Sequence, residues 1–454
     1  MKKKVLKTIC KLSVFVFAVT LNFNPVPFAD ENYDYSNPIY SEGINDTFVY
    51  DTTDSIITTR TDVPRTLPNV TGLYDITYYP IPLINQVPDE ATFELIKAEN
   101  KAIMDKVEED IKNGTLTKHK AADGQFYGTV PDDALGVEKK IYINTNVKGT
   151  HSLASYVPAG EIATVTLNDE ALKYAKQGKI KLSVGMTMVD AEDYHYNHSN
   201  ENRMPYLGKT FSISESETKV GTPFGGMVFI EIAESVPLGT NIEVDIKWVV
   251  DTPYYDLGKT TAEEWKVAKD APGIFAEIRT PYLRFILPAK FIRHIEDPQK
   301  ASEFWTNVTA LSDNAIGLEN RTTPMTLTFD QYITVGIAYA NVWSWSCNLP
   351  PEWSKDAFDY DGLVKNGSWG IIHEINHHYQ RRYNSYSDEW GLGTDFTEIT
   401  NNALSAASYI LYTNIAASRS EEGTYDWNKV ADPYSSLKQQ IFEGVKYYPG
   451  VPNI

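Results

Sequence analysis

The stretch GSWGIIHEINHHYQ, residues 367–380, places His373, Glu374 and His377 inside an apolar helical pattern. Histidines four positions apart lie on one face of an α-helix, about one turn apart, so both imidazoles can reach one ion. The glutamate next to the first histidine projects beside that ion, where it can take a proton from a water molecule. The stretch therefore predicts a helix that carries a two-histidine zinc site.

The alternative is that these residues are ordinary polar side chains on a half-exposed helix. A helix is expected on separate grounds, because residues 366–368 can begin it and apolar side chains recur along one side, at Ile371, Ile372, Ile375 and Tyr379. The chain has only eight histidines, so this spacing rarely arises by chance. We therefore favour the zinc site over the alternative.

A zinc protease needs a third protein ligand, and the sequence restricts the choice. The long metzincin motif would require glycine at position 380 and histidine at 383, where this chain has Gln380 and Tyr383. No histidine follows His378, which points about 100° away from His377 around the helix and is expected to be exposed or to support the ligands. A downstream carboxylate remains, and the candidates are Asp388, Glu389, Asp395 and Glu398.

Glu398 is favoured over Glu389 among these carboxylates. It lies in the first turn of a second predicted helix, TDFTEITNNALSAASYIL, which begins at residue 394. From there it could face the histidine helix, although it could instead be the third-position glutamate of a cap on Asp395. The residue that would stabilise the oxyanion stays open among four tyrosines, Tyr379, Tyr383, Tyr386 and Tyr409.

The beginning of the chain indicates export. MKKKVLKTICKLSVFVFAVTLNFNPVPFAD has lysines ahead of an apolar run from about Leu12 to Leu21. This layout predicts a secretory signal peptide over residues 1–29 and a secreted, extracellular protein. Later stretches are too short or too polar to cross a bilayer, so no integral membrane segment is expected after signal removal.

Charge and cysteine content exclude several classes of protein. The formal net charge is −19 at pH 7, which argues against nucleic acid as a partner. One of the two cysteines, Cys10, lies in the predicted signal, and Cys347 is then the only thiol left in the mature chain. An internal disulfide and a cysteine-rich zinc finger are therefore both excluded.

The remaining chain is predicted to have an α+β fold in three regions. Residues 30–138 form an N-terminal leader, irregular to about 88 and followed by an amphipathic helix over 89–114 that stops at Gly114. Residues 139–255 hold β-rich runs such as EIATVTL and NIEVDIKWVV, which predict an antiparallel, sandwich-like half. Helical patterns prevail over 256–454, beginning with a capping box at Thr261 and Glu264.

Several blocks of sequence carry a resemblance to a known family. Ser368-Trp369-Gly370 leading into HEINHHYQ, followed by TEITNN, is similar to the enhancin-like, mucin-degrading zinc metallopeptidases, a gluzincin group known as peptidase family M60. SYVPAGEIATVTL at 155–167, TPFGGMVFIEI at 222–232 and EEWKVAKDAPGIFAEI at 263–278 resemble that family's other half in the same order. Asn376 departs from the pattern, because the family commonly has glycine there.

The resemblance implies a function and assigns roles to residues. His373, His377 and Glu398 would hold one Zn²⁺, and Glu374 would act as the general base of a zincin-type metalloendopeptidase. The implied substrate is mucin-like O-glycosylated protein. Two alternatives remain open: a non-catalytic glycan-binding adhesin, whose structural zinc would take Cys347 as a further ligand, and a protease of ordinary unglycosylated substrates.

Overall fold

The computed structural model describes residues 54–71, 90–120, 122, 128–185, 203–316, 323–333, 336–342, 344–380, 401–402, 404–405 and 408. These residues divide into two compact units. The sheet unit comprises 54–306 and 323–360, and the helical unit comprises 307–316 and 361–408. The predicted signal peptide over 1–29 lies outside the described residues. Among the helices that are described, none is long and apolar enough to span a membrane.

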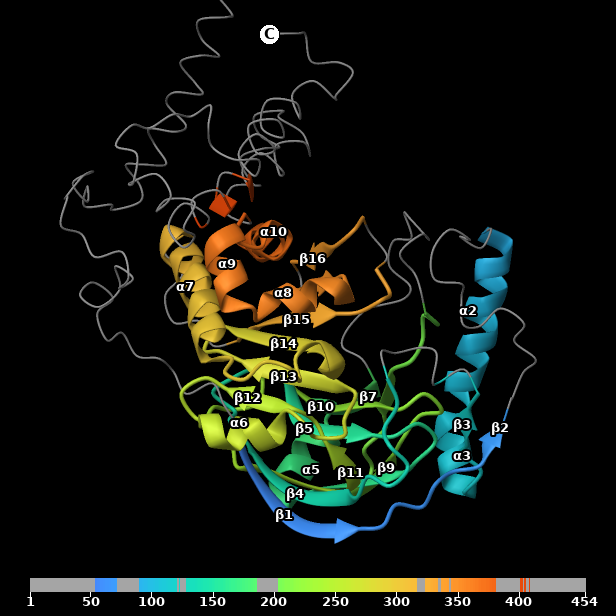
Figure 1. The fold of residues 1–454 in the computed structure, drawn as a ribbon. Coiled ribbons are helices and arrows are strands. Elements are labelled where there is room, and N and C mark those ends of the chain that lie inside the picture. Colours follow the sequence, from blue (N-terminus) through green and yellow to red (C-terminus); the bar gives the residue numbers. More distant parts are fainter. Residues whose placement is uncertain are drawn as a thin grey trace, which may run out of the picture. The chain divides into compact units, whose positions relative to one another are not determined.

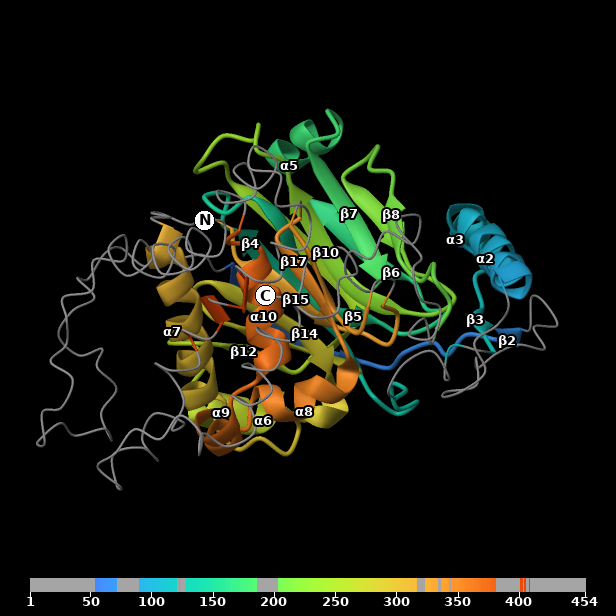
Figure 2. The ribbon, with the colours of Figure 1, turned by 90° about the horizontal axis from the view of Figure 1, so that it is seen from above.

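A nine-stranded antiparallel sheet forms the first layer of the sheet unit (Figures 1 and 2). Strands β1, β4, β11, β5, β10, β7 and β8 follow one another across it, and β6 and β9 extend it from β11. The bounds are β1 Ser55–Val63, β4 Gly136–Ile143, β5 Gly149–Val157, β6 Ala163–Leu167, β7 Ile180–Gly185, β8 Lys209–Phe211, β9 Glu217–Val220, β10 Gly226–Ile232 and β11 Ile242–Asp251.

Alternating burial explains why these stretches form strands with one face in the core. In β6 the residues Ala163, Val165 and Leu167 are buried, and the threonines between them are half-buried. A strand places successive side chains on opposite faces, so this alternation turns every apolar residue of β6 inward. The β-rich, antiparallel character predicted for the N-terminal half is confirmed.

A second large sheet of the sheet unit has six strands, in the order β12, β13, β14, β15, β17, β16. Their bounds are β12 Tyr254–Asp256, β13 Phe275–Arg279, β14 Leu283–Pro288, β15 Met325–Phe329, β16 Tyr339–Asn341 and β17 Ser346–Leu349. All of these strands except β12 lie within the region 256–454, where helical patterns prevail in the sequence. Every residue of β13, β14 and β15 is buried, and a short run buried on both faces lacks the alternation that identifies a strand.

The α-helices within the described ranges are α2 Glu90–Asp105, α3 Val107–Asn113, α5 Asp169–Ala175, α6 Ala262–Ala268, α7 Gln299–Ile316, α8 Ser354–Ala357, α9 Tyr360–Asn366 and α10 Trp369–His377. The helix predicted over 89–114 is interrupted between α2 and α3. Gly114 ends α3 with φ 68°, a conformation that costs glycine little, which confirms the predicted stop. The capping box of Thr261 and Glu264 at the start of α6 is also confirmed.

The leader region requires a correction. Residues up to about 88 were expected to be irregular, but Ser55–Val63 form β1 and pair with β4 along the edge of the large sheet. The stretch SIITTRTDV is rich in β-branched residues, which favour strands. The region was nevertheless predicted to be irregular, because its threonines and aspartate were counted only as polar residues. Two short strands, β2 Val70–Thr71 and β3 Lys118–His119, pair in parallel within the same region.

A buried charge cluster links the two sheets through five side chains: Asp54, His151, Glu277, Arg279 and Arg284. Asp54 precedes β1, and both of its carboxylate oxygens lie 3.0 Å from His151 Nδ1 on β5. The same carboxylate accepts a hydrogen bond from the Asn144 N–H and lies 3.8 Å from Arg279 on β13. Glu277 lies 3.9 Å from Arg279 and 3.3 Å from Arg284.

The protonation of this cluster follows from its contacts. His151 Nε2 lies 3.3 Å from the Val147 carbonyl, so both ring nitrogens of His151 face oxygen atoms. Burial alone would raise the pKa of Asp54. The charge and hydrogen bond of His151, together with Arg279, outweigh burial and lower that pKa below its ordinary value of 3.8.

We predict that Asp54→Asn destabilises the protein by about 3 kcal/mol, because it leaves His151 and Arg279 buried without their anionic partner. The measurement is the midpoint of urea unfolding. The matched control is Glu231→Gln, which removes an exposed ion pair with Lys181 and should cost less than about 1 kcal/mol. Equal effects of the two substitutions would contradict the role assigned to Asp54.

The same pair predicts a pH dependence. Because the pKa of Asp54 is lower in the folded than in the unfolded protein, its contribution is fully present above about pH 4 and is lost as the pH falls through the folded value. Urea midpoints measured at falling pH should therefore drop more steeply for the unmodified protein than for Asp54→Asn. Parallel acid limbs would count against this coupling.

Candidate metal centre

The histidine helix α10 begins directly after a sharp change of chain direction. Gly367 has φ 69°, and its N–H bonds to the Leu363 carbonyl at 2.8 Å, which closes α9. Ser368 precedes α10 but its side chain makes no capping hydrogen bond. Burial of Ile371, Ile372 and Ile375 instead anchors the helix. The predicted helix over the motif is confirmed.

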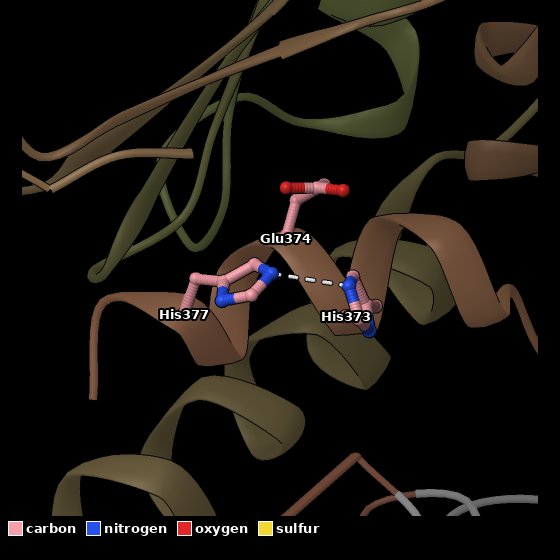
Figure 3. Close-up of side chains that lie close together, drawn as sticks. All are labelled: His373, Glu374 and His377. Carbon is pink, nitrogen blue, oxygen red and sulfur yellow. Dashed lines mark hydrogen bonds between the residues drawn. The ribbon is translucent and has the colours of Figure 1, made fainter. Parts of the chain in front are cut away.

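Two of the three predicted zinc ligands, His373 and His377, lie together on this helix. His373 and His377 point toward each other, with 3.1 Å between their Nε2 atoms, and the carboxylate of Glu374 lies beside them (Figure 3). One ligand atom from each of the three side chains can be chosen so that all lie within 4.8 Å of one another. The spacing inferred from a helical turn is thus realised, and Glu374 belongs to the same group.

The outer nitrogens of the two imidazoles are held by side-chain carbonyl oxygens. His373 Nδ1 lies 3.1 Å from Asn402 Oδ1, and His377 Nδ1 lies 2.8 Å from Gln380 Oε1. An amide oxygen only accepts, so each Nδ1 carries the hydrogen and donates it. In the neutral imidazole the lone pair then lies on Nε2, and both lone pairs face the same point.

These contacts are what a zinc site requires. Two nitrogen ligands at about 2.05 Å from a tetrahedral ion would lie about 3.3 Å apart, close to the 3.1 Å between the Nε2 atoms. Two facing lone pairs without a cation would repel each other. Hydrogen bonds that fix the tautomer of ligating histidines are also the usual support of such sites. The donor set of α10 therefore fits a zinc ion.

Asn376, on the buried side of α10, ties the helix to two other segments. Its Oδ1 accepts a hydrogen bond from Ser312 Oγ of α7 at 2.6 Å, and its Nδ2 donates to Ser405 Oγ at 3.2 Å. Asn401 adds a bond from its Nδ2 to the His373 carbonyl at 3.0 Å. Asn376, which stands where the family commonly has glycine, therefore helps to orient α10 through both atoms of its amide group.

Glu374 is 7 % exposed, and it lies between the two histidines in sequence and close to both ligand atoms in space. A carboxylate in that place can accept a proton from a molecule that approaches the two Nε2 atoms. Its burial keeps bulk water away, which strengthens electrostatic interactions at the site. The structure therefore supplies a basic group next to the candidate metal position.

Other residues singled out from the sequence have different outcomes. Glu398, the favoured third ligand, lies outside the described residues, as do the alternatives Asp388, Glu389 and Asp395. His378 is buried rather than exposed, and it is not part of the candidate metal group found among the described residues. Cys347 is buried in β17, with its sulfur 3.9 Å from that of Met325, and it does not belong to that group either.

Sequence reasoning missed the residues that orient the histidines: Ser312, Gln380, Asn401 and Asn402. The pair Asn401-Asn402 lies in the TEITNN stretch that was noted only for Glu398. The signal that could have found them is a polar pair one helical turn after a predicted ligand. Contacts across 28 and 29 residues, such as those to His373, leave no mark in local periodicity.

Two curated relatives match this chain above 30 % identity. Antigenic protein P1 of Entamoeba histolytica is 34 % identical over 367 residues, which cover 77 % of this chain and 32 % of that protein. Antigenic protein NP1 of the same organism is 37 % identical over 228 residues, 50 % of this chain and 34 % of that protein. The chain thus spans about a third of the length of these relatives.

Solved structures show a more distant similarity. A metallopeptidase in complex with Tn antigen matches with 15 % identity and a TM-score of 0.43, over 63 % of this chain and 49 % of that chain.

Two family models match adjoining parts of the sequence. The model of the N-terminal domain of M60-like peptidases matches residues 134–247, and the model of peptidase M60, enhancin and enhancin-like, matches residues 248–444. Together they cover 134–444 without a gap, including the histidine helix and every strand of the two large sheets except β1. The protein belongs to the enhancin and enhancin-like M60 peptidase family.

Proposed function

We propose that this protein is a secreted zinc metalloendopeptidase that cleaves mucin-like O-glycosylated proteins. The observation that supports the proposal most directly is the convergence of His373, Glu374 and His377 on one side of α10, with both Nδ1 atoms bound to amide oxygens. Glu398 is the proposed third ligand. Export rests on the predicted signal peptide over residues 1–29.

The proposed mechanism divides the work among the side chains of α10. His373 and His377 would hold the zinc ion through Nε2, while Asn402 and Gln380 keep their Nδ1 hydrogens in place. When bound, the ion supplies Lewis acidity that activates water and polarises a peptide carbonyl. Glu374 takes the proton from the attacking water and delivers it to the leaving nitrogen as the peptide bond breaks.

The substrate class rests on family membership and on the resemblance described above. The chain has 29 tyrosines and 9 tryptophans, and aromatic rings are common partners of sugar faces, although most aromatic residues serve the core. Its acidic net charge gives no attraction for negatively charged sugars. We therefore place recognition in neutral parts of the glycan and in the peptide.

The adhesin alternative requires a closed, purely structural zinc site. Its extra ligand was expected to be Cys347, whose thiol is buried against Met325 in the second sheet. A structural zinc site also does not require a general base, whereas Glu374 places a buried carboxylate next to the two histidines. We therefore favour catalysis, and turnover distinguishes the two functions.

We predict that Glu374→Gln retains zinc and lowers peptide hydrolysis at least about 100-fold, because the amide cannot accept the proton. Turnover is measured on a glycopeptide, and zinc is measured by mass spectrometry of the purified protein. The control is Glu303→Gln, on the exposed side of α7, which should leave both unchanged. A fully active Glu374→Gln protein would refute the assignment of the base.

The third ligand can be identified by metal content. We expect Glu398→Ala to lower zinc affinity at least about 10-fold, as loss of a direct ligand should cost no less than loss of a supporting contact. His373→Ala provides the reference for a lost ligand, and Glu389→Ala is the matched control that should retain zinc. Zinc retained in Glu398→Ala but lost in Glu389→Ala would move the ligand to Glu389.

Substrate preference is tested with a mucin-type glycopeptide and the same peptide without its glycan. After incubation with the protein, mass spectrometry should find cleavage of the glycosylated peptide alone, and a chelator should abolish it. Cleavage of both peptides would retain the peptidase and discard the glycan requirement. If zinc-loaded protein cleaves neither peptide, the result favours the non-catalytic adhesin over the peptidase.

A further inference from the structure

The sheet unit contains a cavity of about 170 Å³ to which no function has been assigned above. It lies where segments that precede β4 meet the ends of β5 and β10. The residues that matter for its chemistry are Arg65, Lys118, Asp132, Tyr156, Glu161 and Phe224. A cavity of about 150 Å³ holds one benzene molecule, so this space admits a single six-membered ring.

A buried ion pair forms one wall of the cavity. Arg65 contacts Glu161 through Nε at 3.2 Å and through a terminal nitrogen at 3.1 Å, and both contacts fall on the same carboxylate oxygen, Oε1. The remaining terminal nitrogen of Arg65 donates to the Pro131 carbonyl at 3.0 Å. The two side chains are only 4 % and 8 % exposed. The guanidinium is thus committed to protein acceptors.

The second carboxylate oxygen of Glu161 is different. Within the part of the chain that the structure describes, Oε2 receives no hydrogen bond from a side chain or from the backbone. Burial raises the pKa of the Glu161 carboxyl even though Arg65 opposes that rise. A carboxylate oxygen that no protein donor reaches can accept a charge-assisted hydrogen bond from a ligand. The cavity therefore presents an acceptor to whatever occupies it.

The charges of the lining indicate an uncharged occupant. Arg65 and Lys118 are cations, and Glu161 and Asp132 are anions, so the formal charges cancel. Neither an anion nor a cation is selected by such a lining. Tyr156 and Phe224 also line the cavity but are only 2 % and 1 % exposed, whereas the apolar lining residues Leu67 and Val70 are 49 % and 62 % exposed. A suitable ligand combines hydroxyl donors with an apolar face.

The cavity is also built to persist without a ligand. The Lys118 N–H bonds to the Asn69 carbonyl at 3.1 Å, and the His119 N–H bonds to the Pro223 carbonyl at 2.9 Å. Gly225 has φ 74°, and a Cβ there would lie 2.8 Å from the Tyr156 hydroxyl. Glycine therefore allows the close approach that shapes this wall, and binding need not order it.

We propose that this cavity binds one neutral sugar ring, with a ring hydroxyl donating to Glu161 Oε2. A pyranose ring is close to the volume, supplies a hydroxyl donor, and has an apolar C–H face for the exposed apolar side chains of the lining. The sugar can be free or can belong to a glycan on a protein. The proposal uses no residue of the metal centre and does not depend on peptidase activity.

The experiment is ligand-detected NMR on the full chain with galactose, N-acetylgalactosamine and, as a zwitterionic comparison, glycine. We expect saturation transfer to the sugars, with a dissociation constant on the order of 1 mM for so small a ligand. Thr129→Trp places an indole at an exposed position of the lining and should weaken sugar binding at least about 10-fold. Leu67→Trp, at a lining residue that is 49 % exposed, blocks the cavity independently.

The matched control is Thr210→Trp, an exposed threonine on β8 that does not line the cavity, and it should bind sugar normally. Urea midpoints and glycopeptide hydrolysis are measured for all variants, so loss of folding or of the metal centre is recognised separately. A glycopeptide titrated into Glu374→Gln protein with and without Leu67→Trp shows whether a protein-linked sugar also enters the cavity. Sugar signals that survive both blocking variants, binding of glycine alone, or no binding of either sugar would each overturn the proposal.

Discussion

The contact on which the sheet unit depends is the one between Asp54 and His151. A carboxylate just before β1 meets the imidazole ring of His151 on β5, and the same carboxylate lies near Arg279 in the other sheet. Charges buried this deeply are tolerated only when each has a partner. The cluster therefore fixes which edge of the large sheet accepts β1, and it links that sheet to β13 of the smaller one. Apolar burial stabilises both layers, but these contacts specify their pairing.

In the metal centre, as in the charge cluster, polar side chains hold one another in place, but here the supporting groups are neutral amides. Asn402 and Gln380 use amide oxygens to hold the Nδ1 hydrogens of the two histidines, and Asn376 links α10 to α7 and to Ser405. None of these side chains needs to touch a substrate. They set the tautomer and direction of the groups that would. A motif of five residues is thus supported by polar side chains from before and after it.

The sequence predicted what depends on local spacing. A four-residue interval placed His373 and His377 on one face, and alternation identified strands such as β6. It could not predict contacts made across long stretches of chain, such as those of Asn402 with His373 or of Asp54 with His151. Strands β13 to β15 escaped because both faces are buried, so alternation is absent. Strand β1 was not predicted, because its threonines were counted as polar residues typical of a loop and not as β-branched residues that favour a strand.

The position of Asp54 has a consequence for where this protein can be divided. The regions recognisable as family sequence begin at residue 134, eighty positions after that aspartate. A shortened chain that starts there would retain His151 and the Arg279 cation, and would lack the carboxylate that contacts both of them. Sequence similarity marks the part of the chain that relatives share, whereas electrostatic neutrality marks the part that folds as a unit. In this protein the second boundary lies well before the first.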